Sequence, residues 1–413
     1  MVDTINKFEK RNGIVKMNQL KRGVFFVLIT VIMVQQMPII KDVLYDQIRI
    51  GLYICFGIFS ILSVFQINTI TNRKFFVYFG FTIIYTILLY IISKVFGDGY
   101  NNIFELLVPF GILLCSFCTD FNAEQLGKIL LWQILMSVLL GISSIFYYGE
   151  GFTIASRYFL RSKNQIGPLL GISAIITGAW IINEKQFGIK GANIIVRIGI
   201  FILLLLSILV IRNRAGLLGV FITLLFVLII ECKLKINIKN ILIIQTVLLA
   251  LIVFFLVGAF DGIIDMIYKS FFLNYNITDL NSISAGRIHG YKSSLEFIKQ
   301  YPVLGELGAR ISISNTPHNY ILNKWLNCGV IGSLPIILFY LYLWFFAFKS
   351  INNSNKTIGF NLPIWVLLFS LIVSMFEYTY PYGPGTSQFI VWFLLGQHHR
   401  FHNRHTQSVS NEF

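Results

Sequence analysis

The sequence predicts an all-α polytopic membrane protein with about twelve transmembrane helices. Hydrophobic residues make up 56% of the 413 residues, whereas charged residues make up only 12%. The apolar residues are also gathered into runs close to the roughly 20 residues that a helix needs to cross about 30 Å of hydrocarbon at about 1.5 Å per residue. Together with a mean hydropathy of +0.74, these observations exclude a water-soluble fold.

Twelve apolar runs define the predicted helices. In chain order they are Gly23–Ile40, Ile48–Ile67, Phe75–Phe96, Ile103–Cys118, Ile129–Tyr148, Gln165–Ile182, Asn193–Ile211, Ala215–Ile230, Ile241–Phe260, Asn319–Phe348, Phe360–Phe376 and Ser387–Gly396. No internal repeat or low-complexity tract separates them. Residues 1–413 are therefore expected to form a single integral membrane domain.

The distribution of basic residues predicts the orientation of these helices. The first 22 residues are polar and carry six Lys and Arg, so they do not form a cleavable signal peptide and are expected to stay in the cytoplasm. Alternating crossings then place both termini and 19 of the 33 Lys and Arg on the cytoplasmic side, as the positive-inside rule expects. The net charge of +15 therefore reflects orientation and does not indicate nucleic acid as a partner.

The longest segment between predicted helices, residues 261–317, joins the ninth and tenth helices and is expected to form an extracytoplasmic loop. Within it Ile288, Tyr291, Leu295 and Ile298 recur at spacings of three, four and three, and Pro302 ends the run. This periodicity predicts an amphipathic helix that lies on the outer membrane surface and covers the helix ends.

Among the basic residues predicted on the outer side, against the positive-inside rule, are Arg157, Arg161, Lys163, Arg212, Arg214, Arg287 and Arg310. Arg214 is expected to open the eighth helix, and Lys163 and Asn164 the sixth, where the helix dipole already repels cations. Converging guanidinium groups and free helix N–H groups suit a diphosphate without a metal ion. The alternative is that these cations pair with lipid headgroups or with outer acidic residues.

His318 is the candidate general base. Four of the six histidines, His398, His399, His402 and His405, are expected to form a solvated basic anchor in the tail, with metal binding as the alternative. His289 is two residues from Arg287 and cannot share its helix face. His318 follows Pro317 and is expected in the first turn of the tenth helix, where the dipole would keep the imidazole neutral and able to accept a proton. The alternative is a structural histidine at a helix end.

Glu377, at the outer end of the eleventh helix, is the rival base. With the tyrosine-rich run from Tyr378 to Tyr382 it can instead bind sugar hydroxyls, although aromatic residues at a helix end also anchor helices at the membrane interface. The carboxylates form no compact pair of the kind that holds a divalent metal, and Cys115 and Cys118 form a lone CxxC that is expected to pack as small apolar residues. No metal and no cofactor are therefore expected.

The same residues fall in motifs that resemble those of the O-antigen ligase and polymerase superfamily. The matching elements are Arg161–Asn164, Arg212–Gly216, Ser284–Arg287, Tyr301–Gly308, Pro317–Leu322 and Gly329–Gly332. They fall between about Arg157 and Gly396, which is more than half of the chain. One departure is Asn213, which stands where the family usually has serine, so a bond attributed to that serine cannot be assumed.

The resemblance implies a metal-independent glycosyltransferase, a Wzy-type polymerase of surface polysaccharide (capsule or O-antigen). It would join undecaprenyl-diphosphate-linked repeat units at the outer face of the bacterial cytoplasmic membrane. The resemblance makes His318 the base and places Arg214 and Arg287, with Arg157 and Arg161, at the donor diphosphate. Lys163, Asn164, Arg212 and Asn319 are further candidate substrate-binding residues. The expected partners are the lipid-linked donor and acceptor, the bilayer and, as a candidate, a protein that regulates chain length.

Two alternatives stay open. An O-antigen ligase would use the same donor but transfer the glycan to a lipid A core or another surface acceptor. The Ile-, Asn-, Lys- and Phe-rich composition suggests an AT-rich genome, and a Gram-positive source without lipid A would favour the polymerase. A lipid-linked oligosaccharide transporter would use the basic residues to line a path, but it should show repeat symmetry and ionisable residues deep inside its helices.

Overall fold

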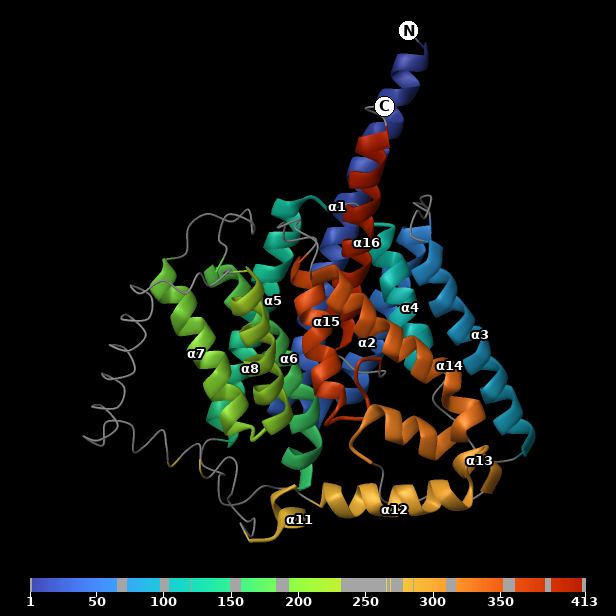
Figure 1. The fold of residues 1–413 in the computed structure, drawn as a ribbon. Helices are drawn as coiled ribbons and strands as arrows, with labels where there is room; N and C mark the ends of the chain where they lie inside the picture. Colours follow the sequence, from blue (N-terminus) through green and yellow to red (C-terminus); the bar gives the residue numbers. More distant parts are fainter. Residues whose placement is uncertain are drawn as a thin grey trace.

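A computed structural model describes residues 2–64, 73–96, 104–119, 121–148, 157–182, 193–231, 265, 268, 278–284, 286–309, 317–351, 361–382 and 388–410. Most of these residues are helical, and no β-strand occurs among them, as the predicted fold class requires. The helices α1 (Val2–Gln36) and α16 (Phe389–Ser410) project together from one end of the bundle (Figure 1). At the opposite end α12 (Arg287–Gln300) lies across the bundle.

Six helices within the described ranges are long and apolar enough to cross a membrane: α1, α2 (Pro38–Val64), α3 (Arg73–Phe96), α5 (Ala123–Tyr148), α6 (Arg157–Ile182) and α14 (Tyr320–Ile351). Four shorter apolar helices accompany them: α4 (Phe104–Phe117), α7 (Ile194–Val210), α8 (Arg214–Glu231) and α15 (Asn361–Ser374). The protein is therefore a multi-pass membrane protein. The predicted segment Ile241–Phe260 lies outside the described residues, so the count of twelve crossings stays a prediction.

The predicted end of the first helix was wrong. It was expected to reach Ile40, but α1 ends at Gln36 and α2 begins at Pro38. Proline has no backbone N–H, so it cannot continue the hydrogen-bond ladder of α1 toward Val34, and it suits the first position of a new helix. The Lys41 amide then donates to the Met37 carbonyl at 2.8 Å and starts the ladder of α2.

The tail histidines nearest the bundle are not solvated, contrary to the prediction. Helix α16 continues well beyond the predicted end at Gly396, and His398 and His399 are 8% and 1% exposed. The His399 ring packs between Phe75 and Phe346, with ring centroids 4.4 and 5.5 Å away. His398 and His399 lie four residues after the buried Leu394 and Leu395 and therefore share their face of α16.

The turn that follows α12 docks against a break in α14. At Gly329 the backbone of α14 has a φ of +63°, which interrupts the regular helix. The Val330 and Ile331 amides then donate to the carbonyls of Pro302 and Val303, at 2.9 and 3.2 Å. Carbonyls of the turn thus replace helix carbonyls as acceptors for the Val330 and Ile331 amides. These bonds hold the end of α12 against α14.

An ion pair inside the bundle joins α14 to α4. Lys324 contacts Glu105, and each side chain is only 3% exposed. The Lys324 ammonium also lies 5.4 Å from the centre of the Tyr320 ring. The pair therefore ties the first turns of α14, which begins two residues after His318, to α4. Removing one partner would leave the charge of the other buried, which destabilises a protein strongly.

Candidate active site

Glu377 is the centre of a polar cluster built from four separate segments. Its carboxylate follows α15 and is only 4% exposed. Arg287 Nη2 donates to Oε1 at 3.2 Å, and Asn164 Nδ2 donates to Oε2 at 3.0 Å. His318 Nδ1 lies 3.4 Å from Oε2. The structure therefore brings together both candidate bases and two of the predicted substrate-binding residues.

His318 does not lie in the first turn of α14, contrary to the prediction. The helix begins at Tyr320 because Asn319 caps it, with Asn319 Oδ1 accepting the Leu322 amide at 3.0 Å. The amide Nδ2 of Asn319 also donates to the Met375 carbonyl at 3.3 Å. Asn319 thus ties the chain around His318 to the chain that leads into Glu377, and His318 stays beside the helix N-terminus.

The geometry of His318 distinguishes its two ring nitrogens. Nδ1 faces the Glu377 carboxylate, and within the described part of the chain Nε2 has no hydrogen-bond partner. The His318 side chain is 38% exposed, which makes it far more accessible than Glu377. A ring whose Nδ1–H donates to a carboxylate has Nε2 as its proton acceptor.

Tyr291 supports His318 from α12 and was not singled out from the sequence as a site residue. Its hydroxyl donates to the His318 carbonyl oxygen at 3.0 Å. Burial raises the pKa of the Tyr291 phenol above its ordinary value, so the hydroxyl keeps the proton that it donates. Only its place in the amphipathic stripe of α12 hinted that it faces the bundle.

Four basic side chains, which we call the basic cluster, gather beside Glu377. Lys163 is partly buried, and the charged groups that act on it most strongly are Arg214, Glu377, Arg212 and Arg287. The basic cluster is therefore Lys163, Arg212, Arg214 and Arg287, which reach this place from α6, the α7–α8 turn, α8 and α12. Guanidinium and ammonium groups gathered in one place suit a multiply charged anion such as a diphosphate.

Asn213 holds two members of the basic cluster together. It caps α8, with its Oδ1 accepting the Gly216 amide at 2.6 Å, and its Nδ2 donates to the Lys163 carbonyl at 2.9 Å. A Cβ at Gly167 would overlap the Asn213 side chain, so glycine on α6 admits this close approach. Asn213, at which the chain departs from the family pattern, is buried between two glycines and bridges α6 and α8.

Other predictions about the site need correction or lie beyond the described residues. Lys163 and Asn164 do not open α6, because the helix begins at Arg157 and both residues lie in its second turn. Their backbone N–H groups are therefore not the free donors of a helix N-terminus. The side chains of Arg157 and Arg161, and all of Arg310, lie outside the described residues. Their roles stay predictions.

The described part of the chain contains no group of three or more His, Cys, Asp or Glu side chains placed to hold a metal ion. The buried Cys115 and Cys118 also form no disulfide there. Whether the reaction needs a metal stays a matter of prediction.

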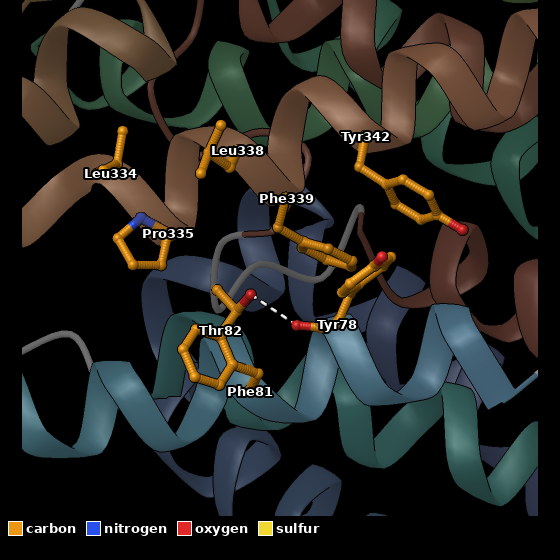
Figure 2. Close-up of a pocket in the computed structure, with 8 residues that line it drawn as sticks. All are labelled: Tyr78, Phe81, Thr82, Leu334, Pro335, Leu338, Phe339 and Tyr342. Carbon is orange, nitrogen blue, oxygen red and sulfur yellow. Dashed lines mark hydrogen bonds between the residues drawn. The ribbon is translucent and has the colours of Figure 1, made fainter.

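A cavity of about 450 Å³ lies between α3 and α14, apart from the polar cluster (Figure 2). Its lining is Tyr78, Phe81, Thr82, Leu334, Pro335, Leu338, Phe339 and Tyr342. The Thr82 hydroxyl bonds to the carbonyl of Tyr78 at 2.8 Å, which leaves the wall almost wholly apolar. Such a wall suits hydrocarbon, and it offers neither an acid nor a base for chemistry.

Comparison with known proteins gives one family match, which covers about a third of the chain. Residues 199–337, which are 139 of the 413 residues, match the family model described as O-antigen ligase. No curated protein matches the chain. The matched segment carries Arg212, Arg214, Arg287 and His318, and the last two contact Glu377 in the fold. This segment is thus similar to the O-antigen ligase family, which confirms the resemblance to the O-antigen ligase and polymerase superfamily seen in the motifs.

Proposed function

We propose that this protein is a surface-polysaccharide polymerase, a glycosyltransferase that joins undecaprenyl-diphosphate-linked repeat units without a metal ion. The observation that carries the proposal is the contact between His318 and Glu377, whose carboxylate also binds Arg287 of the basic cluster. One half of this arrangement can accept a proton, and the other half can stabilise an anionic leaving group. Glycosyl transfer from a lipid diphosphate requires both.

His318 is proposed as the general base. Its Nε2 takes the proton from the acceptor hydroxyl as the acceptor oxygen attacks the anomeric carbon of the donor sugar. Glu377 is the less suitable base, because its carboxylate is buried and contacts Asn164, Arg287 and His318 at once. We assign it the task of orienting the imidazole and stabilising the imidazolium that forms.

The basic cluster is proposed to stabilise the leaving group. As the new bond forms, the bond between the anomeric carbon and the phosphate oxygen breaks, and its electron pair stays on the lipid diphosphate. Arg214 and Lys163 would neutralise that charge, and Arg287 would contact it while holding Glu377. Arginine suits this task because its planar guanidinium binds two phosphate oxygens and stays charged.

The polymerase is favoured over the ligase only by the composition of the chain, so product analysis decides between them. Membranes that contain the protein would receive lipid-linked repeat units as both donor and acceptor. A ladder of glycans still attached to undecaprenyl diphosphate supports the polymerase. Transfer to a separate surface acceptor supports the ligase. In cells that lack the protein, lipid-linked units that stay on the inner face of the membrane support the transporter.

The proposed base is tested by His318→Gln, which keeps a polar side chain but removes the proton acceptor. We expect polymer formation to fall by about 10²- to 10⁴-fold, the usual contribution of a general base, while the protein still accumulates in the membrane. His289→Ala is the matched control, because His289 is an exposed histidine near the start of α12. Equal activity of His318→Gln and the unaltered protein would refute the proposed base.

A further inference from the structure

The tyrosine run that follows Glu377 is divided by the fold. Tyr380 and Tyr382 are fully buried, and Tyr382 stacks on Trp392 with ring centroids 5.5 Å apart. Tyr378, in contrast, is 36% exposed. Its ring centroid lies 6.0 Å from that of His318, with the two rings at 61°. One member of the run therefore lies beside the proposed base, whereas the other two pack in the core.

The chain around Tyr378 is held in place by side chains outside the run. Gln388 Nε2 donates to the Thr379 carbonyl at 3.4 Å, and Trp392 Nε1 donates to the Pro381 carbonyl at 3.0 Å. The Tyr380 amide donates to the Glu377 carbonyl at 3.4 Å. Tyr378 is thus presented on an ordered turn, as a binding surface requires.

The Tyr378 hydroxyl is available to a ligand. Within the described residues it makes no hydrogen bond, and the Glu377 carboxylate lies close enough to act on it. Burial, and then the Glu377 carboxylate, raises the pKa of Tyr378 above its ordinary value, so the phenol stays neutral. A neutral phenol can donate to or accept from a sugar hydroxyl.

Building on the proposed function, we propose that Tyr378 forms the acceptor subsite, with its ring against the C–H face of the acceptor's terminal sugar. The face of a pyranose ring carries C–H groups and the rim carries hydroxyls, so an aromatic ring packs on the face and leaves the rim free. A sugar that packs on Tyr378 would therefore lie beside the His318 imidazole.

The test separates acceptor binding from donor binding in the full-length protein in nanodiscs. Pre-formed polymer on undecaprenyl diphosphate is the donor at fixed concentration, and single repeat units purified from cells that lack the protein are titrated as acceptor. Tyr378→Ala and Tyr378→Leu are expected to raise the apparent acceptor KM by about threefold to tenfold, the usual contribution of one aromatic contact. The donor KM and the kcat at saturating acceptor should change less than the acceptor KM.

Variants that keep a flat ring distinguish binding from a structural role. Tyr378→Phe and Tyr378→Trp should restore most of the acceptor affinity, whereas Leu, which is apolar but not flat, should not. Tyr301→Ala is the matched control, since Tyr301 is similarly exposed at 38% and follows the far end of α12, about 20 Å along the helix from Arg287. If the Ala variant does not accumulate, the Leu variant provides the same measurement.

An unchanged acceptor KM in the Ala or Leu variant overturns the subsite, as does a fall in kcat at an unchanged acceptor KM. These results differ from a failure of the proposed function. If the unaltered protein polymerises and His318→Gln does not, but Tyr378→Ala keeps its acceptor KM, only the subsite is wrong. If the unaltered protein forms no polymer, the proposed function fails and the subsite fails with it.

Discussion

Asn213 shows how one side chain can set the spacing of a cationic site. Its two amide atoms make different bonds, one to the first turn of α8 and one to a carbonyl of α6. Asn213 thus provides a neutral contact between the two helices that carry Lys163 and Arg214, whose like charges repel. A serine at this position can cap α8, but its shorter side chain cannot also reach the Lys163 carbonyl.

Replacing Asn213 tests this bridge. Asn213→Ala should destabilise the protein by about 0.5–2 kcal/mol, the usual cost of losing a helix cap. Asn213→Ser keeps the cap and loses the bond to α6, so its melting temperature should lie between those of Asn213→Ala and the unaltered protein. Thermal unfolding in detergent measures all three. If Asn213→Ser has the same melting temperature as Asn213→Ala, the cap by itself contributes nothing to stability.

At the scale of elements, α12 is joined to α14, the helix that follows His318, at the break in α14. The turn after α12 enters this break, and Gly305 meets the Leu326 carbonyl so closely that a Cβ there would overlap it. Gly329 must also adopt a φ of +63°, which a residue with a side chain rarely adopts. Close contact between backbones therefore explains why Gly305 and Gly329 are glycines.

Gly329→Ala is expected to displace the turn after α12 and, with it, Arg287 and Tyr291 at the site. Activity should fall more than tenfold, and the melting temperature should fall, since the new Cβ would overlap Val303. Gly290→Ala is the matched control, because Gly290 lies in α12 with open space around its Cα. That substitution should be neutral or stabilise the helix by up to about 1 kcal/mol. Polymer formation and thermal unfolding of both variants check the prediction.

At the scale of the whole molecule, the arrangement of the ends predicts the sidedness of the site. The projecting ends of α1 and α16 lie opposite α12 in the bundle (Figure 1). If the basic N-terminal segment is cytoplasmic, as the positive-inside rule expects, α12 and the Glu377 cluster face the outside. This is the side on which the proposed substrates would meet the enzyme.

Cysteine labelling in intact cells checks this sidedness. In a background without the native cysteines, Lys299→Cys on the exposed side of α12 should react with a membrane-impermeant maleimide before the cells are lysed. His402→Cys, which replaces an exposed residue of α16, should react only after lysis. The reverse pattern would place the candidate active site in the cytoplasm and contradict the proposed function.

The sequence by itself determined the membrane class and the position of most helices, because these depend on short-range patterns of apolar residues. It also indicated His318, Glu377, Arg214 and Arg287 as candidates, since each is unusual at its own predicted position. Its errors were local as well. His318 was wrongly placed in the first turn of α14 because Pro317 and Asn319, which flank it, both suit a helix beginning, and Asn319 is the residue whose side chain caps the helix.

Only the tertiary structure decided which of these residues meet. Asn164 and Glu377 are 213 positions apart in the chain and 3.0 Å apart in the fold, a contact that no periodicity encodes. The fold also gives the two candidate bases different surroundings, which residue type could not predict. The Glu377 side chain is buried, whereas that of His318 is partly exposed. Helix positions follow from each segment's own preference for lipid or water, whereas the site arises where several segments pack together.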